Sequence, residues 1–263
     1  MKKKYLILII ASLMMLAGLV WIVWGNITVG LSRITITDNS VPKALDGLRI
    51  AHVSDLHNSR LWRKTITLLE EAKPDIICIT GDLVDSRQPD FVAAYAFVAE
   101  AIRIAPCYYI PGNHEHRFSS EKFIELMDDL RELGVTVLLN ENTTFDRNGE
   151  KLIIVGYSHG NVSNLPKSEG YRLLLAHHPE KFLDYANEDY DLILCGHAHG
   201  GQFRLPIVGG LYAPGQGAFP QYDAGLFRRD DATMIVNRGI GNSGFPIRFA
   251  NRPEVIVITL NCS

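Results

Sequence analysis

The sequence predicts an α/β fold in which two mixed sheets form a sandwich, flanked by helices and preceded by one apolar helix. Strand-like and helix-like segments alternate through the first half of the chain and strand-like segments dominate the second half, which is typical of α/β sandwiches. The 263 residues are enough for one sizeable core, and an uncharged apolar run precedes it. We therefore expect one folded domain behind an amino-terminal anchor.

The amino terminus is a candidate membrane anchor. Residues 1–4 (MKKK) are a basic flank, and residues 5–25 form an uncharged apolar run of about the length that crosses a bilayer as a helix. A cleaved signal peptide is the alternative, but its apolar region is normally about 7–15 residues long and ends at small residues. Because this run ends in WIVW at 21–24, as an interfacial anchor does, we favour an uncleaved transmembrane helix.

The charges around this run predict its orientation. The three leading lysines favour a single-pass protein with a cytosolic amino terminus, which would place the rest of the chain outside the cytoplasm. Arg33 and Lys43 lie on the other side of the run and weaken this preference. The lipid bilayer is thus an expected partner.

Charge and cysteine content narrow the classes of function. The formal charge is −3 and becomes −6 without the three leading lysines, whereas a nucleic-acid-binding protein would more often be basic. We therefore expect no nucleic-acid partner. Three of the four cysteines lie in apolar runs typical of core strands, and no metal-type CxxC is present. Cysteine usage does not decide the compartment.

The elements behind the anchor follow from local patterns. Residues 26–45 are expected to be a short strand-forming connector, and residues 46–263 the folded domain. Short runs rich in β-branched residues and bounded by turn signals predict buried strands at 48–54, 75–80, 107–110, 151–156, 171–176, 191–195, 233–237 and 254–260. Apolar residues at helical spacing predict helices at 62–74, 91–105 and 119–134.

Polar side chains gather where five of the predicted strands end. The strand at 191–195, for example, runs into GHAHGG, which places two histidines among glycines. Ligand sites in open α/β sheets lie beyond the carboxyl ends of strands, so we expect these side chains to meet at one edge. The residues that the five strand ends deliver are Asp55, His57, Asp82, Asn113, His114, His177, His197 and His199. Oxygen and imidazole ligands without thiolate suit Mn²⁺, Fe or Zn²⁺.

The same residue types suit a pair of divalent ions. A carboxylate can bridge two ions about 3.5–4 Å apart, and such a pair can hold both the attacking and the leaving oxygen of a phosphoryl displacement. Gly81, Gly112 and Gly196 beside the expected ligands would let the backbone and the ions approach closely. We therefore expect two divalent metal ions as cofactors.

Five motifs, in order along the chain, resemble those of the calcineurin-like metallophosphoesterases. They are Asp55-x-His57, Gly81-Asp82-x-x-Asp85, Gly112-Asn113-His114-Glu115, a single His177 and Gly196-His197-x-His199. The resemblance covers residues 46–260 and implies the four-layer αββα sandwich of that family. The segments GHAHGGQFRLPIVG and NRGIGNSGFPIRFANRPE look like a membrane-associated branch that includes UDP-2,3-diacylglucosamine pyrophosphatases.

The resemblance implies a role for each motif residue. The residues implied to hold one ion are Asp55, His57, Asp82 and His199. Those implied to hold the other are Asp82, Asn113, His177 and His197. Asp82 would be the bridge, and a water or hydroxide between the ions would be the nucleophile. His114 would face the substrate phosphate, stabilising charge or protonating the leaving oxygen, and Asp85 would orient its ring.

Other suggestive residues have simpler interpretations. His52 lies inside a predicted strand and is expected in the core, whereas His178 precedes Pro179 and is expected to line the pocket or cap a turn. Residues 239–244 (GIGNSG) match the dinucleotide-binding pattern G-x-G-x-x-G, but Phe245-Pro246 follows in place of a helix. We interpret that stretch as a loop near the rim of the active site.

The sequence predicts a membrane-anchored, metal-dependent phosphoric ester hydrolase. Phosphodiester or pyrophosphate bonds are favoured over protein phosphates, because residues 81–88 read GDLVDSRQ and lack the DRG continuation of protein phosphatases. The anchor favours an amphiphilic phosphoester, such as UDP-2,3-diacylglucosamine or a phospholipid. The alternative is a membrane-tethered protein that binds metal and phosphate without turnover. The sequence leaves the oligomeric state open.

Overall fold

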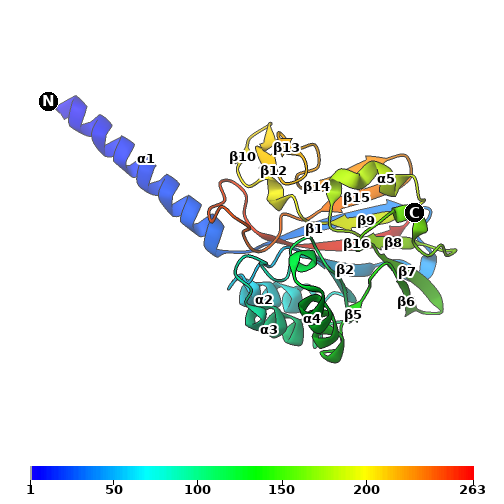
Figure 1. Cartoon of the computed structure of the whole chain (residues 1–263). Helices are drawn as coiled ribbons and strands as arrows, with labels where there is room; N and C mark the ends of the chain where they lie inside the picture. The colour runs from blue at the N-terminus through cyan, green and yellow to red at the C-terminus, as the bar shows by residue number, and fades with distance from the viewer. Residues whose placement is uncertain (1) are drawn as a thin grey trace.

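The computed structural model describes residues 2–263 and begins with one long helix, α1 (Lys2–Ile27). Its segment Lys4–Ile27 is long and apolar enough to cross a membrane, and its most apolar stretch is not buried against the domain. Figure 1 shows α1 projecting away from the body of the molecule. The predicted anchor at 5–25 lies inside α1, whereas Met1 of the predicted basic flank lies outside the described residues.

The first sheet has the strand order β1-β16-β2-β3-β4-β5. Strands β2 to β5 are mutually parallel, as helix crossovers require, whereas β16 is antiparallel to β2 and parallel to β1. Their bounds are β1 (Gly30–Asp38), β2 (Leu48–Val53), β3 (Ile76–Thr80), β4 (Cys107–Ile110), β5 (Thr136–Val137) and β16 (Glu254–Cys262). Because β1 lies inside the segment predicted as a connector (26–45), this sheet begins ahead of residue 46.

The second sheet has the strand order β14-β15-β9-β8-β7-β6. Its four inner strands are parallel, and the edge strands β6 and β14 pair antiparallel to them. Their bounds are β6 (Asn142–Arg147), β7 (Glu150–Gly156), β8 (Arg172–Leu175), β9 (Leu192–Cys195), β14 (Gly225–Arg229) and β15 (Ala232–Val236). The edge strands were not predicted, because their half-exposed faces carry few apolar residues.

Helices cover the outer faces of both sheets. Their bounds are α2 (Trp62–Ala72), α3 (Phe91–Ala101), α4 (Ser120–Glu132) and α5 (Phe182–Ala186). α3 begins after Asp90, whose side chain accepts the N–H of Val92, and α4 begins after Ser119, whose hydroxyl accepts the N–H of Lys122. The predicted helices at 62–74, 91–105 and 119–134 are confirmed with slightly shorter ends.

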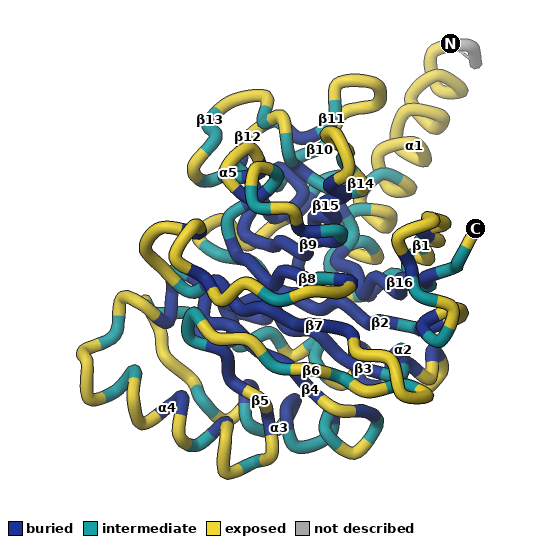
Figure 2. The backbone as a smooth tube through the Cα atoms, turned by 90° about the vertical axis from the view of Figure 1, so that its right-hand side faces the viewer, coloured by how far each residue is buried: buried dark blue, intermediate teal, exposed yellow. Residues whose placement is uncertain are grey.

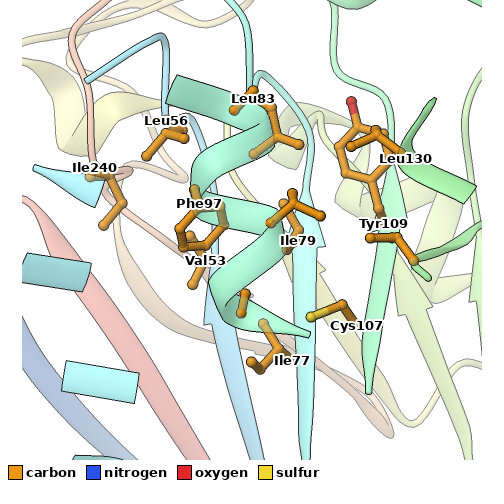
Figure 3. Close-up of a cluster of buried hydrophobic side chains, with 14 of the residues drawn as sticks. Val53, Leu56, Ile77, Ile79, Leu83, Phe97, Cys107, Tyr109, Leu130 and Ile240 are labelled. Carbon is orange, nitrogen blue, oxygen red and sulfur yellow. The ribbon is translucent and has the colours of Figure 1, made fainter. Parts of the chain in front are cut away.

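Apolar cores lie between successive layers. Val53 and Phe97 belong to the core between the first sheet and α2 to α4 (Figure 3), and Ile50 belongs to the core between the two sheets. Consecutive residues of a strand point to opposite faces, so Ile154 joins the core between the sheets while Ile153 joins the core under α5. This order of layers confirms the predicted αββα sandwich (Figure 1).

Short elements connect these layers. Two small hairpins follow β9 and pair β10 (Arg204–Leu205) with β11 (Gly209–Gly210), and β12 (Tyr212–Ala213) with β13 (Gly217–Ala218). Figure 2 shows that the hairpin tips are exposed, whereas the sheet strands are largely buried. Single 3-10 turns lie at Lys43–Leu45, Glu115–Arg117, Val162–Asn164, Pro179–Lys181 and His199–Gly201.

Candidate metal centre

The carboxyl ends of parallel strands from both sheets meet at one place. β2, β3 and β4 come from the first sheet, β8 and β9 from the second, and each is followed by residues of the predicted site. Nδ1 of His177, after β8, donates to the carbonyl of Thr80 at the end of β3 over 2.7 Å, which joins the two sheets. All seven predicted ligands come together here, and six of them are buried.

One cluster consists of Asp55, His57 and His199. Oδ1 of Asp55 lies 3.7 Å from Nε2 of His57 and 3.5 Å from Nε2 of His199. The two imidazole rings stack with their centroids 5.0 Å apart. Donor atoms of all three side chains lie within 4.8 Å of one another, a spacing that suits one shared ion.

A second cluster surrounds Nε2 of His177. This nitrogen lies 3.3 Å from Oδ2 of Asp82, 3.2 Å from Nδ1 of His197 and 3.1 Å from Oδ1 of Asn113. The hydrogen bond from Nδ1 of His177 to Thr80 turns Nε2 towards the other three side chains. These side chains could therefore hold a second ion.

Asp82 lies between the two clusters. Its Oδ2 is 3.4 Å from Nε2 of His57 in the first cluster and 3.3 Å from Nε2 of His177 in the second. Its Oδ1 accepts the backbone N–H of His114 at 2.8 Å, which fixes the rotation of the carboxylate. Asp82 is thus placed as a bridging ligand would be.

The protonation states of His197 and His199 suit cation binding. Burial lowers the pKa of His197 and that of His199 to about 3, so both rings are neutral and carry a free lone pair. Burial also disfavours a charged His177, but the carboxylate of Asp82 outweighs this effect and raises the pKa of His177 to about 10. Burial alone would raise the pKa of Asp55, yet the histidines beside it, His199 foremost, hold that pKa well below its usual value.

His57 provides a test of whether the site fits an ion. Its side chain is buried, and neither ring nitrogen has a hydrogen-bond partner among residues 2–263. Such a group is costly to bury, and Nε2 faces the carboxylates of Asp55 and Asp82. A divalent ion would supply the missing partner, and the oxygen and imidazole donors suit Mn²⁺, Fe or Zn²⁺. The site therefore fits a pair of divalent ions.

The backbone at these ligands is strained and closely packed. In the described chain five of the seven expected ligands have left-handed φ values, namely Asp55 (52°), His57 (44°), Asp82 (55°), His197 (65°) and His199 (48°). Backbone strain of this kind concentrates at functional sites. A Cβ on Gly112 would lie 2.7 Å from the backbone nitrogen of Asp82, and one on Gly196 would overlap Oδ2 of Asp55. The backbone therefore approaches the neighbouring ligands closely at these two glycines.

His114 lies at the edge of the first cluster, its ring centroid 4.6 Å from that of His57. The backbone N–H of Ser86 donates to Nδ1 of His114 at 3.0 Å, and Oδ1 of Asp85 approaches the same nitrogen at 3.3 Å. Because an amide N–H can only donate, Nδ1 is the acceptor and the proton of the neutral ring is on Nε2. The 3.4 Å approach of Arg117 to Nε2 is longer, so it does not change this assignment.

Glu115 is a site residue whose role sequence reasoning missed. Its buried carboxylate accepts the backbone N–H groups of Asp82 (2.9 Å), Val84 (3.0 Å) and Gly112 (2.8 Å). It thereby fixes the loop that carries Asp82 to the loop that carries Asn113. Burial, together with the charge of Asp82, raises the pKa of Glu115 to about 7. Its place directly after Asn113-His114 was the available signal.

Arg248 is a second residue that sequence reasoning missed. It is 2% exposed, and its guanidinium donates to Oδ1 of Asn242 (2.7 Å) and to the carbonyl of Arg238 (2.6 Å). Its Nη2 lies 3.3 Å from Nδ1 of His199, the ring nitrogen on the side away from Asp55. The loop that contains Arg248 therefore positions a ligand of the first cluster.

Two further histidines, His52 and His178, lie close to the site residues. His52 lies in the core as predicted, with Nε2 2.8 Å from Oγ1 of Thr80. His178 is half-buried beside the second cluster, where its Nδ1 lies 3.0 Å from Oε1 of Glu180 and its ring centroid 4.4 Å from that of His197. It contacts a ligand of the second cluster and directly precedes the 3-10 turn Pro179–Lys181.

Fold and site together define a hydrolase built around a dinuclear metal centre. Residues 48–201 match the calcineurin-like phosphoesterase family, and the chain belongs to this family. Calcineurin-like phosphoesterases use a dinuclear divalent metal centre, and this chain is a metal-dependent phosphoric ester hydrolase. The family predicted from the five motifs is thus confirmed.

Relatives match nearly the whole chain. The phosphodiesterase YaeI of Escherichia coli K12 is 34% identical over 234 residues, 85% of this chain and 84% of that protein. The metallophosphoesterase YkuE of Bacillus subtilis 168 is 33% identical over 86% of this chain and 83% of its own length. A transmembrane protein with metallophosphoesterase domain from Danio rerio is 29% identical over 86% of this chain and 56% of its own length.

Proposed function

We propose that this chain is a membrane-anchored phosphodiesterase or pyrophosphatase that acts on an amphiphilic phosphoester. The observation that carries the proposal is the pair of ligand clusters on either side of Asp82, whose Oδ2 lies within 3.4 Å of a ring nitrogen in each. The two divalent ions would be held by Asp55, His57, Asp82, Asn113, His177, His197 and His199. Such ions would supply the Lewis-acid chemistry of phosphoester hydrolysis.

His114 would act on the substrate directly. Burial lowers its pKa, so the ring is neutral at pH 7 and offers the proton on Nε2. That nitrogen lies 3.2 Å from Oγ of Ser243. It could donate a hydrogen bond to a phosphoryl oxygen or protonate the leaving oxygen, while the N–H of Ser86 holds the ring in place through Nδ1.

A cavity beside His114 supports a substrate with a second substituent on phosphorus. It has a volume of about 410 Å³, and its lining includes Asp85, Arg87 and Asn242. Arg87 binds Asp85 and also Ser243, the residue next to Nε2 of His114. The cavity could receive the second ester group of a diester or the second phosphate of a pyrophosphate. Arg87 would balance the charge of such a phosphate.

The anchor supports action at a membrane. α1 is long and apolar enough to cross a bilayer, and the Danio rerio relative is described as a transmembrane protein. The leading lysines favour a cytosolic amino terminus, which would place the catalytic domain (46–263 together with β1) outside the cytoplasm. Lipid-linked or nucleotide-sugar phosphoesters such as UDP-2,3-diacylglucosamine are therefore the first substrates to screen.

Hydrolysis of bis-p-nitrophenyl phosphate by the full chain in detergent tests this proposal. We expect turnover that requires Mn²⁺, exceeds turnover of the monoester p-nitrophenyl phosphate, and is lost in Asp82→Asn. Asp128→Asn, on the exposed face of α4, is the matched control and should keep full activity. Full activity in Asp82→Asn would refute the proposal. Tight metal binding without turnover of any diester would favour a membrane-tethered binding protein.

A further inference from the structure

Five exposed apolar side chains outside α1 lie on two neighbouring loops. One is the tip of the β10–β11 hairpin and the other is the loop 243–249. The residues that we call the apolar tips are Leu205, Ile207, Val208, Phe245 and Ile247. Ile207 is fully exposed, and its φ of 70° is rare for a β-branched residue. Nothing in the described domain packs against this side chain.

The two loops form one unit that contacts α1. Phe203 pairs with Phe249, and its ring centroid lies 5.4 Å from that of Phe245. The side chain of Gln202 donates to the carbonyls of Phe245 (2.9 Å) and Ile247 (2.7 Å). Phe249 in turn meets the ring of Trp21 on α1 edge-on, with the centroids 5.5 Å apart. The apolar tips therefore flank the helix.

The end of α1 is attached to the domain by specific bonds. Nδ2 of Asn26 donates to the carbonyl of Arg248, and Oδ1 of Asn26 accepts the N–H of Arg248, each at 2.8 Å. The guanidinium of Arg252 lies over the ring of Trp24, 4.5 Å from its centroid. Figures 1 and 2 show that α1 and the small hairpins rise from the same end of the molecule. A bilayer around α1 would therefore meet the apolar tips.

The junction also carries charges that suit lipid headgroups. Nζ of Lys64 donates to the carbonyl of Ile27 at the end of α1. A cavity of about 130 Å³ between α1 and the domain has Trp21, Trp24, Arg238 and Arg252 in its lining. Tryptophans favour the membrane interface, and cations there attract anionic headgroups. This charge pattern favours a bilayer over a second copy of the chain as the occupant of the surface.

We propose that the apolar tips insert into the leaflet from which α1 emerges, so that the domain lies on the lipid surface. This inference rests on the proposed membrane anchoring. The same loop carries Ser243, whose Oγ is 3.2 Å from Nε2 of His114, only two residues before Phe245. Docking therefore places this loop, with the cavity lined by Arg87 and Asn242, at the headgroup layer, where the phosphoester of a lipid could enter without leaving the membrane.

The test measures the depth of a fluorophore attached to the hairpin tip. The full chain carrying Ile207→Cys and Cys262→Ser is labelled with nitrobenzoxadiazole (NBD) and reconstituted into phosphatidylcholine vesicles with one fifth phosphatidylglycerol. The other three cysteines are buried and should not react. The matched control is Ile124→Cys, an exposed apolar position on α4 on the other side of the domain (Figure 1).

We expect lipids with a nitroxide at acyl carbon 5 to quench the probe at 207 at least twofold more than the probe at 124. Aqueous iodide should show the reverse preference. Equal lipid quenching at the two positions would overturn the proposal. Protection of position 207 from both quenchers would also overturn it, because a protein surface would then cover the tip. The readout needs no turnover, so failure of docking and failure of the proposed hydrolase are observed separately.

Discussion

Replacing Gly196 with Ala should weaken one of the two metal sites and spare the other. Gly196 follows β9 and has a φ that any residue adopts, so the change adds only a methyl group. That methyl would overlap both Oγ of Ser54, its nearest neighbour, and Oδ2 of Asp55. The N–H of His197 holds the carboxylate of Asp55 in place, 3.2 Å from Oδ1 and 3.0 Å from Oδ2.

The size of the effect follows from this overlap. To restore ordinary van der Waals contact the Asp55 oxygen would have to move by about 1 Å, and a shift of that size can cost about 100-fold in activity. Disturbing a ligand in this way typically weakens metal binding by about 10- to 100-fold, or about 1.4 to 2.7 kcal/mol. The second cluster does not include Asp55 and should keep its affinity.

Calorimetric titration of the metal-free full chain with Mn²⁺ would measure both sites. We expect two binding events in the original chain and, in Gly196→Ala, one unchanged event and one weakened event. Gly30→Ala is the control, because its added methyl would meet its nearest neighbour at 3.6 Å. Two unchanged events in Gly196→Ala would refute the reasoning. Recovery of affinity on adding Ser54→Ala would show that Ser54, rather than Asp55, carries the clash.

Three further results are expected. Glu115→Gln should leave one of three buried N–H groups without an acceptor, which should cost about 1–3 kcal/mol of folding free energy. The melting temperature should fall by about 2–4 °C for each kcal/mol. An unchanged melting temperature would contradict this prediction. Burial lowers the pKa of His52 to about 3, so the unfolded chain binds the extra proton below pH 6.5 and stability falls as the pH drops. Between pH 6.5 and 5 the original chain should therefore lose about 2 kcal/mol more than His52→Gln in urea unfolding, and equal losses would count against this account. Chelation should abolish turnover and lower the melting temperature. An ion at 100 times its Kd adds about 2.7 kcal/mol per site to the free energy of unfolding. A melting temperature unaffected by chelator would argue against metal in the folded chain.

Local pattern was sufficient for the strands and for the ligands that follow them. All eight strands expected from apolar runs are present in the described chain, and the residues after five of them converge at the site. Parallel strands that end at one edge deliver their following residues together, so chain order alone placed Asp55, Asp82 and His177 near one another. The edge strands β6 and β14 were not predicted, because an edge strand needs few apolar residues.

The sequence by itself therefore predicted the layers, the apolar helix and which polar residues follow the strand ends, because these depend on residue type and on spacing along the chain. Only the tertiary structure decided which histidines share an ion-sized space, which nitrogen of His114 carries its proton, and that Glu115 and Arg248 brace the ligands. It also placed β1 beside β16 and the apolar tips beside α1. These features arise from contacts between segments far apart in the chain, which no local pattern encodes.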